Sequence, residues 1–261
     1  ADVMRDLVEW VVSLGGITGP LRVRECAEKG RGLLTTRAVE EGELLLRVPL
    51  RLIFTDMYAR GTLLGRLLCA VLPSITGAEV VSVQLVYERM LGDASQWAVW
   101  LRSVPSSYTS LPYWSEVDIH SFGDDAIGKA LIARAHAELR QLHARHELLR
   151  RIIGDAGENW APLFKTFDWL QFTWAWSSVH SRAASIDWRS HALQTAKFKS
   201  DRAAAGTEMG LALVPIGDLF NHRPGAHTSA RYIDAVPPTH AATTTVIAAA
   251  AAAADTAGMR R

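Results

Sequence analysis

Apolar residues recur at helical spacing at the beginning of the chain and again through its middle. Residues 2–14 place Leu7 and Val11 on one face of a helix, and the glycines at 15–16 end the pattern. Helical spacing also dominates between residues 62 and 180, with amphipathic segments at 63–71 and 80–91. We therefore expect a short opening helix and a large helical region in the middle of the chain.

The longest helical pattern follows Asp124, a residue type that caps helix N-termini, and ends at Gly154. The apolar positions expected to share one face of this helix are Ile127, Leu131, Ala135, Leu139, Leu142, Leu149 and Ile153. A second helical stretch at 167–181 carries Trp169, Trp174 and Trp176, for which we expect buried packing.

Short runs with the pattern of β-strands flank this helical region. LRVREC, GLLTTRAV, ELLLRVP and RLIF are separated by the turn-forming KGRG and EEGE, and LALVPIGDLF follows the helices. After Tyr232 the sequence is rich in Pro, Thr and Ala, and we expect no packed structure there. The pattern predicts an α+β fold with small sheets near residues 16–60 and 206–234, interrupted by a mostly helical insertion.

Composition and charge narrow the classes of function. A hydrophobic fraction of 49% in 261 residues supports a sizeable core, and 28 basic against 27 acidic residues argue against a nucleic-acid or membrane partner. The alanine-rich run is too short to span a bilayer, which takes about 20 apolar residues. Cys26 and Cys69 lack metal spacing and favour an intracellular compartment, without choosing among cytoplasm, nucleus and plastid. We expect a monomer.

The first candidate site is the glycine-spaced segment Lys29, Gly30, Arg31, Gly32, between two predicted strands. Glycines permit backbone angles that turns require, so such a segment is most often only a turn. In a functional site, the missing side chains would let backbone groups approach a small ligand closely. The spacing matches neither a dinucleotide fingerprint nor a phosphate loop.

Two further motifs end apolar segments with polar side chains. Asp218, Asn221 and His222 follow a predicted strand, where they could line a pocket; helix capping and a satisfied core histidine are the structural alternatives. Ser181 and Arg182 follow the tryptophan-rich segment. An arginine fork suits a carboxylate ligand, and a surface salt bridge is the alternative.

Histidines raise the question of a metal site. His143 and His146 lie on the long helix without the spacing of a zinc motif, and we interpret this pair as part of a solvated face. A second possible metal site, formed by Asp218, His222 and His227, is similarly weak. The sequence contains no GxSxG nucleophile elbow, and neither cysteine has a convincing base partner. We predict no metal site.

Sequence blocks in a fixed order resemble a known family. KGRGLLTTRAVEEGELLLRVPLRLIFT, WAVWLRSVPSSYTSLPYWSE, FTWAWSSVHSRA and LVPIGDLFNH resemble the insertion-bearing SET-domain methyltransferases, which include the Rubisco large-subunit lysine and actin-histidine methyltransferases. The resemblance covers most of residues 15–222. It implies S-adenosylmethionine-dependent N-methylation of a non-histone protein, with lysine as the expected acceptor. In-line methyl transfer in that family depends chiefly on orientation.

The resemblance also implies site residues. In the family, the glycine-spaced loop wraps the methionine part of the cofactor, the arginine pairs with the cofactor, and the D-x-x-N-H residues contact adenine and the methionine part. The implied cofactor-binding residues are Lys29, Gly30, Arg31, Gly32, Arg182, Asp218, Asn221 and His222. Ser181, beside the arginine, would line the substrate channel.

One part of the family pattern is missing after His222. The sequence contains neither the GE-x-V-x-x-x-Y segment that supplies the methyl-transfer tyrosine nor the N-x-E-L block, and the surroundings of Tyr232 do not match. No catalytic residue is therefore assigned. The alternatives are a C-terminally truncated methyltransferase, which the degenerate tail favours, and a non-catalytic SET-like module that binds protein.

The predicted organisation follows from these blocks. Residues 1–61 form the opening helix and first SET part, 62–178 the helical insertion, 179–236 an incomplete second SET part, and 237–261 a low-complexity tail.

Overall fold

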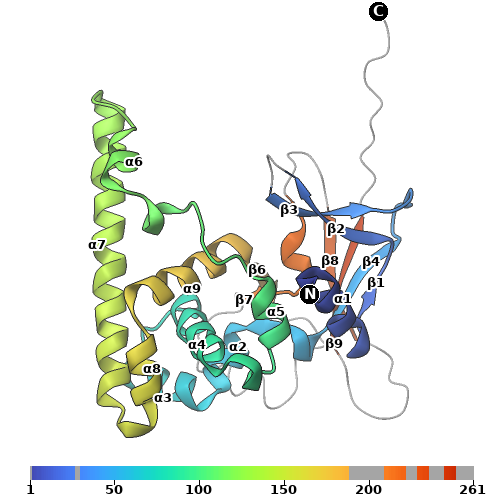
Figure 1. Cartoon of the computed structure of the whole chain (residues 1–261), viewed down its shortest axis with the longest axis horizontal. Helices are drawn as coiled ribbons and strands as arrows, with labels where there is room; N and C mark the ends of the chain where they lie inside the picture. Colours follow the sequence, from blue (N-terminus) through green and yellow to red (C-terminus); the bar gives the residue numbers. More distant parts are fainter. Residues whose placement is uncertain (1, 27–29, 188–208, 222–227, 235–243, 251–261) are drawn as a thin grey trace, which may run out of the picture. The chain divides into compact units, whose positions relative to one another are not determined.

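The computed structural model describes residues 2–26, 30–187, 209–221, 228–234 and 244–250 (Figure 1). The chain divides into two compact units: residues 1–55 together with 184–261, and residues 56–183. The second unit corresponds to the predicted insertion, but it is wider than the predicted range of 62–178. The difference arises because α2 follows β5 directly and α9 continues to Arg182.

The second unit is built of helices. Their bounds are α2 (Asp56–Gly61), α3 (Leu63–Val71), α4 (Gly77–Leu91), α5 (Ala98–Ser103), α6 (Glu116–His120), α7 (Ala126–Asp155), α8 (Ala161–Thr166) and α9 (Trp169–Arg182), with 3-10 turns η2 (Gly92–Ala94), η3 (Leu111–Tyr113) and η4 (Glu158–Trp160). None of the helices in the described part of the chain is long and apolar enough to cross a membrane.

Helices α4 and α9 pack against each other at the centre of this unit (Figure 1). Valines 80, 81, 83 and 86 of α4 are buried, as are Phe172, Trp174 and Val179 of α9. The prediction of buried tryptophans is therefore confirmed for Trp174, whereas Trp169 and Trp176 are half-buried. Two helices buried on most of their sides form a core on which shorter helices pack.

The long helix α7 begins one residue later than predicted. Its N-cap is Asp125, because the carboxylate of that residue accepts a hydrogen bond from Gly128 N at 2.7 Å. The predicted apolar face is buried at Leu142, Leu149 and Ile153, but Ile127 near the N-terminus is 72% exposed. The apolar pattern thus continues beyond the part of the helix that the core covers.

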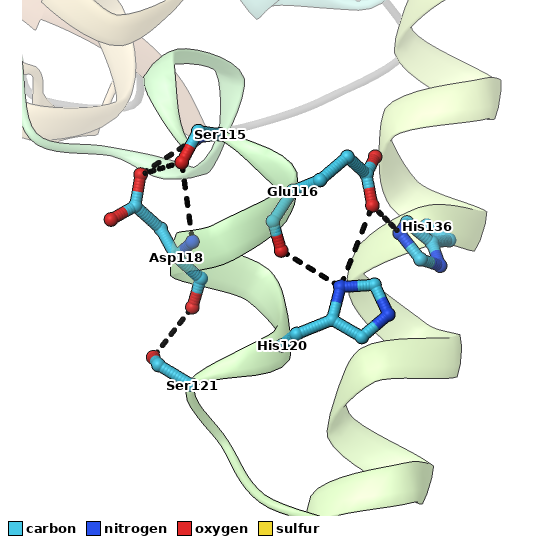
Figure 2. A network of polar contacts seen from close by, with 6 residues as sticks. All are labelled: Ser115, Glu116, Asp118, His120, Ser121 and His136. Atoms are coloured by element: carbon cyan, nitrogen blue, oxygen red, sulfur yellow. Dashed lines mark hydrogen bonds and ion pairs between the residues drawn. The ribbon is translucent and has the colours of Figure 1, made fainter.

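Helix α6 packs beside this exposed end of α7 through a polar network (Figure 2). Glu116 Oε2 lies 3.0 Å from His136 Nε2, and His120 Nδ1 lies 2.8 Å from the backbone oxygen of Glu116. Ser115 and Asp118 form a capping box at the start of α6. The contact of Glu116 with His136 links α6 to a polar position of α7.

The first unit contains an opening helix and small sheets. Its elements are α1 (Val3–Ser13), β1 (Ile17–Thr18), β2 (Leu21–Cys26), β3 (Gly30–Thr35), β4 (Leu44–Pro49), η1 (Leu50–Leu52), β5 (Phe54–Thr55), β6 (Ala184–Asp187), β7 (Met209–Leu213), η6 (Gly217–Leu219), β8 (Thr228–Asp234) and β9 (Thr244–Ala250). Among the described strands the orders are β1-β4-β9-β8, β2-β3 and β5-β7-β6, and the pairs are antiparallel. The predicted opening helix and the α+β class are confirmed.

Strand β9 departs from the expectation that the tail has no packed structure. Its backbone pairs with β4 on one side and with β8 on the other. The expectation came from side-chain composition, which shows no alternation of apolar and polar residues. A strand with neighbours on both sides satisfies its N–H and C=O groups through the main chain, so its pairing does not require such a pattern.

Candidate functional site

The glycine-spaced segment opens strand β3. Gly30 pairs with Cys26 and Gly32 with Arg24 in the antiparallel β2-β3 hairpin. Gly30, Arg31 and Gly32 are thus strand residues rather than residues of the predicted turn, and Lys29 lies outside the described residues. Gly30 has a φ of 64°, a left-handed conformation that favours glycine over residues with side chains.

The second motif follows strand β7 in a tight, strained turn. Asp218, half-buried within η6, donates its backbone N–H to Val214 O at 2.9 Å. Ile216, immediately before η6, has a φ of 65° and is 1% exposed. A β-branched residue in this region costs about 1–3 kcal/mol, and such strain concentrates at functional sites. The packing around Ile216 therefore holds this turn in one conformation.

The structure brings together Gly32 and Asn221, which come from the two separate sequence segments of the first unit. A Cβ atom on Gly32 would lie 2.2 Å from Asn221 Nδ2, so only glycine leaves the amide where it is. Gly32 is buried and Asn221 is exposed. The polar amide of one motif thus lies against the bare backbone of the other, while His222 lies outside the described residues.

Ser181 and Arg182 belong to the second unit, at the C-terminal end of α9. The hydroxyl of Ser181 donates to Ser177 O at 2.6 Å, and the side chain is exposed. Arg182 is half-buried and is the last helical residue. The helix therefore presents an arginine where its own partial negative charge accumulates.

Residues 105–110 carry contacts that the motifs did not indicate. The hydroxyl of Tyr108 lies 2.8 Å from Ser178 Oγ, and the hydroxyl of Ser110 lies 2.8 Å from Ser177 Oγ. Both residues stand within one of the family-like blocks, which was the available signal, but no chemistry in their sequence pattern pointed to α9.

The two histidines that we interpreted as a solvated face of α7 lie in different surroundings. His143 is exposed and stacks on the Trp169 ring with centroids 3.5 Å apart, whereas His146 is only 3% exposed. Burial lowers the pKa of His146, although Phe167 O and Glu147 act in the opposite direction. The solvated interpretation was wrong for His146 because Phe167 and Phe172 cover it.

No metal centre accounts for these histidines within the described ranges. No group of three or more His, Cys, Asp or Glu side chains there could hold a metal ion. His222 and His227, which we weighed with Asp218 as a possible metal site, lie outside those ranges.

No family model matches the chain. Curated proteins are similar to it. The actin-histidine N-methyltransferase of Xenopus tropicalis is 26% identical over 230 residues, and that of Danio rerio is 25% identical over 236 residues. Each alignment covers 87% of this chain but only 36% and 35% of the respective relative. The chain thus spans about a third of the length of these curated relatives.

Solved structures share its architecture. The SET domain of LSMT bound to lysine and AdoHcy superposes with a TM-score of 0.71 over 94% of this chain and 50% of that one, at 20% identity. The chain has a SET-domain fold. Rubisco LSMT bound to AdoMet also superposes on this chain, with a TM-score of 0.61 and 19% identity over 95% of this chain and 49% of that one. The resemblance to SET-domain methyltransferases is confirmed.

Proposed function

We propose that this SET domain binds S-adenosylmethionine and belongs to a protein N-methyltransferase. The main supporting observation is the close approach of Gly32 to Asn221, which joins two motifs that the family resemblance assigns to the cofactor. The similar proteins are actin-histidine N-methyltransferases, and the similar structures hold AdoMet, AdoHcy or lysine. The chain spans about a third of the length of those relatives, and methyl transfer by this chain is a proposal.

The residues fit the chemistry of this ligand. A zwitterionic sulfonium compound with an adenine ring requires a cation for its carboxylate, main-chain acceptors for its amine and an apolar slot for its ring. Arg182 is the proposed carboxylate partner, and Gly30, Arg31 and Gly32 the proposed backbone surface. Lys29, Asp218, Asn221 and His222 complete the proposed set, and Ser181 lines the proposed substrate channel. When bound, the cofactor supplies a methyl group on a sulfonium centre.

The proposed acceptor is a side-chain nitrogen of a non-histone protein. Lysine follows from the resemblance and from the lysine bound in one similar structure, whereas the curated relatives are named for histidine. Either nitrogen must be neutral to attack, and a dry channel favours the neutral form of lysine by lowering its pKa.

Calorimetric titration with S-adenosylhomocysteine tests cofactor binding directly. We expect one site per chain; a chain that is folded by circular dichroism and shows no binding would overturn the proposal. Radiolabelled S-adenosylmethionine with actin or Rubisco as acceptor then tests transfer. Binding without transfer would favour the non-catalytic module, which is the second candidate.

Gly32→Ala is expected to weaken S-adenosylhomocysteine binding about tenfold, the equivalent of one lost hydrogen bond to a charged group. The added Cβ would displace the Asn221 amide, whose position it overlaps. Because Asn221 is exposed and can rotate away, we expect the melting temperature to change little.

Gly42→Ala provides the matched control for this substitution. Gly42 has a φ of 83° and nothing within 4 Å of an added Cβ, so alanine there costs about 1–2 kcal/mol of backbone strain while affinity stays the same. Wild-type affinity in Gly32→Ala would contradict the role of the Gly32–Asn221 contact.

A further inference from the structure

Side-chain hydrogen bonds tie the C-terminal half of α9 to the segment 105–110. Trp174 Nε1 donates to Pro105 O at 2.8 Å. Tyr108 OH and Ser178 Oγ lie 2.8 Å apart, as do Ser110 Oγ and Ser177 Oγ. We call these contacts the α9 anchor; both of its sides belong to the same unit.

The α9 side of the anchor is buried. Trp174, Ser177 and Ser178 are only 2–3% exposed, so water does not readily replace a lost partner. Ser178 Oγ also donates to Trp174 O at 2.8 Å. A hydroxyl has one proton to donate, so Ser178 accepts and Tyr108 donates in their contact. The Tyr108 hydroxyl therefore has a defined direction.

The anchor holds the last turns before Arg182. Ser177 carries the backbone oxygen that accepts the Ser181 hydroxyl, and Ala183 N still bonds to Val179 O at 2.9 Å. Arg182 is thus the last residue of a helix that side chains fix immediately upstream. Helix ends otherwise fray, because their last carbonyls lack intrahelical partners.

We propose that Tyr108 and Ser110 are positioning residues that set the place of the Arg182 guanidinium, an inference that rests on the proposed cofactor role of Arg182. Paired hydrogen bonds from an arginine fork to a carboxylate require its placement within about 0.5 Å. A helix end that shifts by more than that loses one of the two bonds. Tyr108 and Ser110 act through Arg182 and need no contact with the ligand.

A double-mutant cycle measured by calorimetry with S-adenosylhomocysteine tests this coupling. We expect Tyr108→Phe to lower affinity about three- to tenfold, the range for a weakened hydrogen bond to a charged group. In the Arg182→Ala background, Tyr108→Phe should change affinity by less than about twofold, because the residue through which it acts is already absent.

Tyr58→Phe is the matched control. The Tyr58 hydroxyl donates to Glu88 Oε1 at 2.9 Å in the same unit, so its loss also removes a part-buried hydrogen bond. We expect a lower melting temperature with unchanged affinity. Ser110→Ala gives a second, smaller perturbation of the anchor, and Ser110→Thr, which keeps the hydroxyl, should restore affinity toward the wild-type value.

The outcomes separate the two proposals. Absence of binding by the wild-type chain defeats the proposed function, and the positioning role with it. Wild-type binding combined with an unchanged affinity of both Tyr108→Phe and Ser110→Ala overturns the positioning role alone. Equal effects of Tyr108→Phe with and without Arg182 overturn it too, since they would show a general loss of structure.

Discussion

Arg145→Ala is expected to lower the free energy of unfolding by about 2–4 kcal/mol, the range for breaking a buried ion pair, reduced because part of the arginine is in water. The side chain of Glu79 is only 4% exposed and that of Arg145 is 32% exposed. Arg145 contacts both carboxylate oxygens, with Nη2 at 2.9 Å from Oε2. Without Arg145, the Glu79 carboxylate would remain buried, and Thr76 would be its one remaining hydrogen-bonding partner among the described residues.

Arg134→Ala on the same helix is the matched control. Arg134 pairs with Glu138 four residues away, and the side chains are 76% and 50% exposed. Such exposed pairs contribute little, so urea denaturation should give the wild-type midpoint. If Arg145→Ala also unfolded at the wild-type midpoint, the pair would not anchor α7 to α4.

The same pair predicts a dependence on pH. Burial raises the pKa of Glu79, but the hydrogen bonds from Arg145 and Thr76 outweigh it and hold the pKa below its ordinary value of 4.5. A carboxyl whose pKa is lower in the folded state contributes stability above its unfolded pKa, and this contribution is lost as pH falls through the folded pKa. The wild-type protein should therefore lose this contribution as pH falls below about 4.5. Arg145→Ala, in which Glu79 lacks the arginine, should lose less stability over the same range in urea denaturation.

Arg182→Ala is expected to weaken S-adenosylhomocysteine binding by about 1.5–3 kcal/mol, the contribution of a hydrogen bond between charged groups. Arg182 ends α9, so alanine there removes the guanidinium without leaving a cavity in the core. The measurement is calorimetric titration of both proteins. Affinities that agree within error would rule out Arg182 as the carboxylate partner.

Arg66→Ala controls for the loss of one positive charge from this unit. Arg66 is exposed and donates to Gly61 O at 2.8 Å near the start of α3. We expect its affinity to equal that of the wild type. A loss in both variants would point to a general electrostatic effect, and the effect of Arg182→Ala would then vary with salt concentration.

Local patterns along the chain determined most of the secondary structure. The opening helix, the β2-β3 hairpin and the helical middle all follow from the spacing of apolar residues, because that spacing reflects the period of the local backbone. The motif blocks also determined the SET-domain resemblance, which the comparisons confirm. The roles of the site residues stay predictions.

Tertiary structure decided which distant residues meet. Spacing cannot show that Asn221 lies against Gly32, since the contact depends on how η6 packs beside β3. Nor can it show that Phe167 and Phe172 cover His146. It also cannot show that Glu79 is buried beside an arginine.

The physical reason is that the spacing of apolar residues along the chain shows which of them share a face of one helix or strand. Whether that face is buried depends on what packs against it. The apolar face of α7 shows both parts: its period was evident in the sequence, but only the fold left Ile127 exposed and covered Leu149. Strand β9 shows the reverse, because main-chain pairing placed a segment whose side chains carried no pattern.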